Sequence, residues 1–116
     1  MKDISQQNSS NFIDVIKRLT SVKNIDLNFY QNKRTFLTQA CICNNSEIVR
    51  VLLESNQVDV NMYELDNFNT PLIISIINEN ANIAKILIDY PKTNINFVNE
   101  KFETALTIAS TKNQIE

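Results

Sequence analysis

The sequence predicts an all-α repeat solenoid, a stack of short helix pairs joined by projecting loops. Three series recur with a period of 33 to 35 residues: an extended segment that ends in asparagine, a threonine that opens an apolar stretch, and an apolar pattern with helical spacing. These series are marked by Asn28, Asn61 and Asn96, by Thr35, Thr70 and Thr104, and by Val15, Ile48 and Ile83. Because one unit of this length cannot bury its apolar face alone, neighbouring units are expected to stack.

The composition limits what this chain can do. Its 116 residues suit one domain, and 43% of them are apolar, enough for a core. The net charge of −2 argues against binding to nucleic acid and gives no reason to expect an anionic membrane as partner. There is no histidine and no glycine, so the commonest general base and every glycine-rich phosphate loop are excluded. The sequence therefore predicts no enzyme and no cofactor.

Each unit is predicted to contain two helices. The threonine is an N-cap whose hydroxyl accepts a free backbone N–H, and Pro71 suits the first helical position. First helices are predicted over residues 36–43, 72–78 and 105–111, and second helices over 47–55 and 83–90. A polar break separates the two helices of a unit, and Pro91 ends the last of the second helices.

The two ends of the chain differ from the middle. Residues 1–9 are predicted to be disordered, and 10–21 to form a lone second helix that caps the array. The repeat domain would span 10–116, with its last repeat truncated before a second helix, so that Leu106, Ile108 and Ile115 lie near an open end. Two interpretations stand: the chain is a fragment of a longer protein, or this end packs against another copy.

The repeated unit resembles the ankyrin repeat. Thr70-Pro71-Leu72, a small residue at Ser75, and the apolar pattern of the second helix carry the match in the middle unit. The segment Val58-Asp59-Val60-Asn61 carries it at the end of the preceding unit. The resemblance covers about residues 12–115 and implies a solenoid of about three repeats plus the N-terminal capping helix.

This chain departs from the family pattern where the family has histidine and glycine. Thr38, Ile73 and Thr107 replace the histidine. Asn44, Glu79 and Asn113 replace the first glycine, and Arg34, Asn69 and Glu103 replace the second. Asparagine tolerates positive φ better than other non-glycine residues, whereas glutamate does not. We therefore expect the break near Glu79 to fall on Asn78 or Asn80, and the array to be only modestly stable.

The resemblance implies a protein–protein interaction module, a scaffold or adaptor, whose partner lies on the loop tips and first helices. Carried over position by position, and with the aromatics of the loops added, the partner-binding residues would be Tyr30, Gln31, Asn32, Arg34, Tyr63, Asp66, Asn67, Phe68, Asn69, Asn78, Glu100, Lys101, Phe102 and Glu103. Phe29, Met62 and Phe97 are expected to pack loop against loop. The alternatives are self-association through the open C-terminal end, or a targeting segment of a larger enzyme.

Cys41 and Cys43 are the only cysteines. Residues two apart on a helix point to different faces, so the pair is not expected to hold a metal. Two cysteines at this spacing also form no disulfide framework, and residues 1–10 lack the apolar core of a signal peptide. We therefore expect a reducing cytoplasmic location, with the nucleus as an open alternative.

Overall fold

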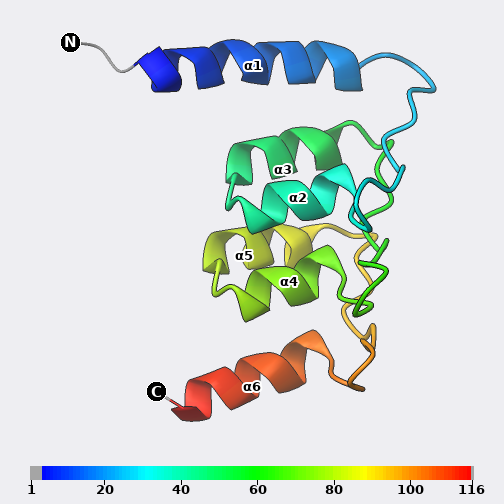
Figure 1. Ribbon diagram of the computed structural model, residues 1–116, viewed down its shortest axis with the longest axis vertical. Coiled ribbons are helices and arrows are strands. Elements are labelled where there is room, and N and C mark those ends of the chain that lie inside the picture. Colours follow the sequence, from blue (N-terminus) through cyan, green and yellow to red (C-terminus); the bar gives the residue numbers. More distant parts are fainter. Residues whose placement is uncertain (1–3, 116) are drawn as a thin grey trace.

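The chain folds into a stack of helices (Figure 1). The computed structural model describes the backbone of residues 4–115 and the side chains of 12–113. Within these residues it contains six helices and no strand: α1 (Ile4–Thr20), α2 (Phe36–Ile42), α3 (Ser46–Glu54), α4 (Pro71–Ile77), α5 (Ala81–Asp89) and α6 (Ala105–Ile115). The all-α prediction is confirmed.

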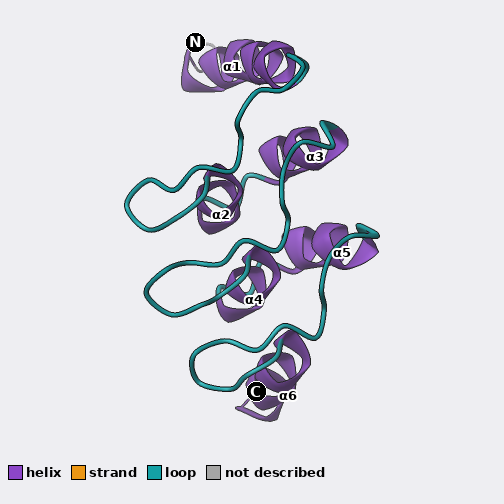
Figure 2. Ribbon diagram, turned by 90° about the vertical axis from the view of Figure 1, so that its right-hand side faces the viewer, coloured by secondary structure: helices purple, strands orange, loops and turns teal. Residues whose placement is uncertain are grey.

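The helices form two columns (Figure 2). The first helices α2, α4 and α6 stack in one column, and α1, α3 and α5 stack in the other. Across the columns α2 packs against α3, and α4 packs against α5. The loops that precede α2, α4 and α6 all project to the same side, as the repeat pattern predicts.

Local capping chemistry sets where the first helices begin. The side chain of Thr35 accepts the N–H of Thr38 at 3.1 Å, and Thr70 accepts that of Ile73 at 3.3 Å. Thr104 accepts the N–H of its third following residue in the same way, at 3.2 Å. Each bond satisfies one of the orphan donors of a helix N-terminus, and the predicted N-caps are confirmed.

The helix bounds agree with prediction in the middle of the chain and differ at its ends. The helix α5 ends at Asp89 because Pro91 forces Tyr90 into extended backbone, with ψ of 123°. The helix α1 begins at Ile4, whereas the sequence predicts a disordered segment over 1–9; residues 1–3 lie outside the described residues. The helix α6 continues to Ile115, past the predicted end at residue 111.

The core runs along the interface between the two columns. Its fully buried side chains include Leu37 of α2, Leu52 of α3, Ile73 of α4, and Ile83 and Leu87 of α5. At the position where the family has histidine, the first unit has Thr38, which is buried and accepts a hydrogen bond from the Thr35 hydroxyl at 3.0 Å. This bond stays within one turn, so it bridges less of the unit than an imidazole does.

Several turns of this chain contain a residue other than glycine with a positive φ angle. Asn44 has φ of 55°, as predicted. The prediction for the second unit was wrong, because Glu79 itself has φ of 60° while Asn78 and Asn80 keep φ of −87° and −88°. Asn78 closes α4, and Asn80 is the N-cap of α5 whose Nδ2 donates to the carbonyl of Cys41 at 3.1 Å. Only Glu79 remains to make the turn.

At the second family glycine position, just before each threonine, the residue with positive φ also differs from the expected one. Positive φ falls on Lys33, Phe68 and Phe102, one residue before the expected Arg34, Asn69 and Glu103. The expected residues instead close the hairpins, since the carbonyls of Arg34, Asn69 and Glu103 accept backbone N–H groups from the opposite side of each hairpin.

Replacing Glu79 with glycine is expected to raise the free energy of unfolding by about 0.5–1 kcal/mol, because glycine removes the Cβ clash at positive φ. Urea unfolding measures the change. Asn44→Gly is the matched control, since asparagine already tolerates its φ of 55°, and we expect a smaller gain there. A loss of stability in the Glu79 variant would contradict the assigned backbone geometry.

Candidate protein-binding surface

Three hairpins project from the stack, one before each first helix. Backbone hydrogen bonds close all three. In the first hairpin Gln31 and Arg34 each donate an N–H to the carbonyl of the other. In the second the N–H of Glu64 donates to the carbonyl of Asn69 at 2.9 Å, and in the third the N–H of Asn99 donates to the carbonyl of Glu103 at 3.0 Å. The residues enclosed are 32–33, 65–68 and 100–102. These different loop lengths explain part of the drift in the repeat period.

Asparagine side chains shape the second and third tips. The Oδ1 atom of Asn67 accepts the N–H of Asn69 at 2.9 Å. The Oδ1 atom of Asn99 accepts the N–H groups of Lys101 and Glu103, both at 2.9 Å. Such side-chain turns replace backbone turn bonds and hold the hairpins without glycine.

Two buried polar residues tie neighbouring hairpins together, and sequence reasoning missed both. Glu64 accepts hydrogen bonds from Nε of Arg34 at 2.5 Å and from Nδ2 of Asn67 at 3.1 Å, so its buried carboxylate is paired. Asn99 donates to Oδ1 of Asn69 at 2.8 Å and to Oε1 of Glu103 at 3.0 Å. Their spacing of 35 residues matches the repeat and was the available signal.

The tips also bond to one another through their backbones. The N–H of Leu65 donates to the carbonyl of Lys33 at 3.1 Å, and the N–H of Glu100 donates to the carbonyl of Asn67 at 3.0 Å. An exposed ion pair joins Lys33 to Asp66 at 2.9 Å. The three tips therefore form one continuous ridge. We name its exposed side chains the tip surface: Gln31, Asn32, Lys33, Leu65, Asp66, Phe68, Glu100, Lys101 and Phe102.

The aromatic residues of the loops divide into packed and exposed ones. The ring of Tyr63 lies 5.2 Å from that of Phe68 and 5.4 Å from that of Phe97, so Phe97 packs loop against loop as predicted. Phe29 is exposed, and that prediction was wrong for it. The Tyr30 hydroxyl donates to the carbonyl of Tyr63 at 2.8 Å. The pKa of Tyr30 is raised, mainly by partial burial of its hydroxyl and to a smaller extent by the nearby Tyr63 and Asp59.

The predicted partner-binding residues do not all reach this ridge. Four of them are half-buried, and their side chains form hydrogen bonds or ring contacts within one loop or between two loops: Tyr63, Asn67, Asn69 and Glu103. Asn78 is exposed but closes the far end of α4, away from the tips. Tyr30 and Arg34 are exposed but engaged, in a hydrogen bond and an ion pair respectively. The others lie on the tip surface: Gln31, Asn32, Asp66, Phe68, Glu100, Lys101 and Phe102.

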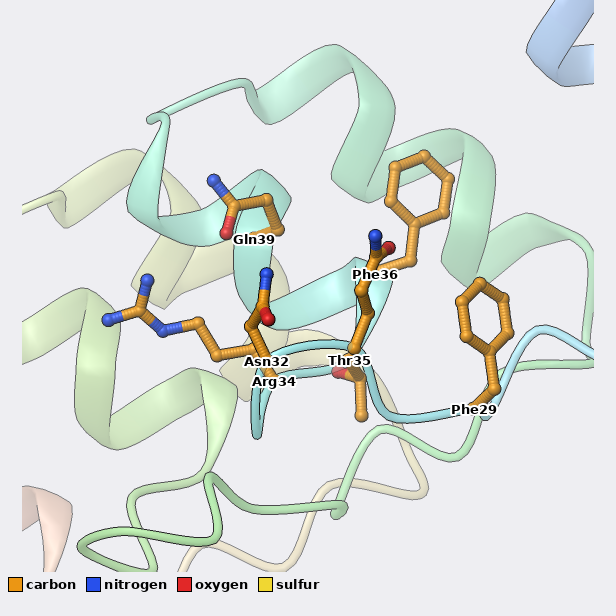
Figure 3. Close-up of a pocket in the computed structure, with 7 residues that line it drawn as sticks. Phe29, Asn32, Arg34, Thr35, Phe36 and Gln39 are labelled. Atoms are coloured by element: carbon orange, nitrogen blue, oxygen red, sulfur yellow. The ribbon is translucent and has the colours of Figure 1, made fainter.

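A shallow pocket of about 360 Å³ lies between the first hairpin and α2 (Figure 3). The rings of Phe29 and Phe36 stand on one side of it, and the polar side chains of Asn32, Arg34 and Gln39 stand on the other. Sequence reasoning missed Phe36, since its register in the other units is occupied by the buried Pro71 and Ala105.

The cysteines lie on different faces of the chain, as predicted. Cys41 is buried, Cys43 is exposed and both are free thiols. Burial raises the pKa of the Cys41 thiol to about 12. In the part of the chain that the structure describes, no group of three or more His, Cys, Asp or Glu residues is placed to hold a metal ion. No helix among residues 4–115 has the length and apolar content needed to cross a bilayer.

The stacked helix pairs and their projecting hairpins define a helical repeat solenoid. Residues 23–75 match the family model of ankyrin repeats (many copies), and this segment includes the first two hairpins, α2, α3 and most of α4. The resemblance to the ankyrin repeat is thus confirmed over residues 23–75, and α5 and α6 continue the same architecture beyond the matched segment. No curated protein was found to match the chain.

Proposed function

We propose that this chain binds another protein through the tip surface, as a scaffold or adaptor module. Ankyrin repeats are generally protein–protein interaction modules. The observation that carries the proposal is the exposure of Phe102, which is 88% exposed at the third tip and lies between Lys101 and the half-buried Glu103. Burying the ring of an exposed phenylalanine against a partner removes apolar surface from water, which stabilises the complex.

The rigidity of the ridge supports the same proposal. Paired Glu64 and Asn99 lock neighbouring hairpins, and backbone bonds join the tips, so little conformational entropy is lost on binding. Phe68 and Phe102 are anchors of the kind that dominate interface energies, whereas Asp66 and Lys101 set the charge pattern that a partner must complement.

The proposal assigns no reaction to the chain. The ankyrin repeat family is typically non-enzymatic, and a role as the targeting segment of a larger enzyme would use the same surface for the same task. We place this task in a reducing intracellular compartment, the cytoplasm first and the nucleus second. The two free cysteines support that location.

Swapping the charges of Asp66 and Lys101 tests the surface. In a pull-down from an extract of the source cells, we expect the Asp66→Lys, Lys101→Glu variant to recover bound proteins at least about tenfold less well than the unmodified chain, because close like charges at an interface cost on the order of 1–2 kcal/mol. Quantitative mass spectrometry of the eluates measures recovery.

The control is a second swap that also preserves net charge, Lys85→Glu with Asp89→Lys on the exposed face of α5. It should leave recovery unchanged. Equal recovery by the tip variant and the unmodified chain would reject the tip surface as the binding site.

A further inference from the structure

The helix α1 is a second helix without a first helix beside it. Leu19 has the register of Leu52 and Leu87, which are both fully buried, yet it is 52% exposed. Phe12 and Val15 of the same helix are also exposed. The helices α3 and α5 each pack against the first helix of their own unit, whereas among residues 4–115 the main packing partner of α1 is α3. One side of α1 is therefore an uncovered apolar stripe.

The helix α6 is a first helix, and no second helix follows it among residues 4–115. Leu106 has the register of the buried Leu37 and Leu72 but is 75% exposed. Ile88 and Ile95 are exposed where the equivalent Leu53 and Val60 are buried. These exposed residues line an apolar pocket of about 320 Å³ together with Ala105 and Ala109. Ile108 was expected at this open end but is buried, and the Ile115 side chain lies outside the described residues.

An asparagine clamp joins each unit to the next. The side chain of Asn28 accepts the N–H of Asp59 at 2.7 Å and donates to the carbonyl of Gln57 at 3.0 Å. Asn61 repeats the clamp one unit later, on the N–H of Asn94 at 2.8 Å and the carbonyl of Lys92 at 2.9 Å.

The third copy of the clamp is vacant. Asn96 lies at the edge of the apolar pocket, and no partner for its side chain is present among residues 4–115. The repeat assigns its two missing partners by register, because Asp26 has the register of Asp59 and Asn94, and Asn24 has that of Gln57 and Lys92. Both residues follow α1, at the other end of the same chain.

We propose that the chain associates head to tail, with α6 of one copy taking the place of the first helix that α1 of the next copy lacks. The pair then forms a complete unit: α6 packs against α1 of the second copy as α2 packs against α3, and α6 stacks on α2 of the second copy as α2 stacks on α4. Leu106 covers Leu19 of the second copy, and Asn96 clamps Asp26 and Asn24 of that copy.

The remaining features of the two ends agree with this arrangement. Phe36 is exposed where the equivalent Pro71 and Ala105 are buried, which places the pocket beside Phe29 and Phe36 under the incoming α6. The C-terminal end of α6 and the N-terminal end of α1 both point away from the hairpins, so they can run antiparallel like the helices of an inner unit (Figure 1). The two surfaces differ from each other, so the contact is heterologous and adds copies in a chain or ring.

The test is the mass of the 116-residue chain in solution, measured by sedimentation equilibrium over a wide concentration series. We expect the mass to rise above 13.3 kDa with concentration. Leu19→Lys and Leu106→Lys should each weaken association roughly a hundredfold or more, since each puts a charge into the apolar contact. Mixed in equal amounts, the two variants retain one intact contact and should form a dimer of 26.6 kDa, twice 13.3 kDa.

Ile77→Lys is the matched control, because Ile77 is an exposed apolar residue of the inner helix α4, outside both contact faces and the tip surface, and the mass of this variant should follow that of the unmodified chain. Both contact positions are exposed within one copy, so circular dichroism should show that the variants remain folded. An unmodified chain that stays at 13.3 kDa at every concentration overturns the proposal and leaves both faces to another protein. Self-association of the Leu19 variant alone, or a mixture that stays monomeric, also overturns it. Partner binding at the tips is tested separately, by the pull-down with the Asp66 and Lys101 swap.

Discussion

Replacing Leu37 with alanine is expected to lower the free energy of unfolding by about 2–5 kcal/mol, because this side chain is 1% exposed and its loss leaves a cavity between the columns. The total stability of a chain of this size is on the order of 5–15 kcal/mol. We therefore expect a large shift in the urea midpoint, followed by circular dichroism at a concentration low enough to keep the chain monomeric.

Leu106→Ala is the matched control, since it makes the same chemical change at the same register of another unit. Leu106 is 75% exposed, so we expect a change within about 0.5 kcal/mol. Equal losses at the two positions would mean that α6 is covered within a single copy, contrary to the structure.

The second large effect is a loss of stability at alkaline pH caused by Cys41. Burial raises the pKa of this thiol from its ordinary value of 9.0 to about 12, so the folded chain keeps a proton that the unfolded chain releases. The stabilisation is fully present below pH 9 and is lost as the pH rises from 9 toward 12. The difference of three pKa units corresponds to at most about 4 kcal/mol.

Urea unfolding between about pH 8 and about pH 10.5 tests this expectation. Most lysine side chains keep their charge over the greater part of this range. The Cys41→Ala variant should lose stability at every pH but show a flatter decline, whereas Cys43→Ser, at the exposed thiol, should keep the full decline. Identical slopes for the Cys41 variant and the unmodified chain would refute the assignment. Thiol labelling near pH 8 should modify one cysteine in the folded chain and two after denaturation.

The sequence by itself determined the features that one unit encodes locally. The period of 33 to 35 residues, the threonine N-caps, the Pro91 stop and the opposite faces of Cys41 and Cys43 all follow from interactions within a few residues of the chain. Capping and helical periodicity act over one or two turns, so a single sequence contains all the information they need.

Only the tertiary structure decided which equivalent residues are covered. Leu37 and Leu106 share one register and one chemical identity, yet one is buried and the other is exposed, because burial depends on the neighbouring unit. The same reason applies to Glu64, whose carboxylate is paired by Arg34 from the preceding hairpin. The positive φ of Glu79 was likewise decided by its surroundings, since Asn80 is held by the carbonyl of Cys41 across the stack.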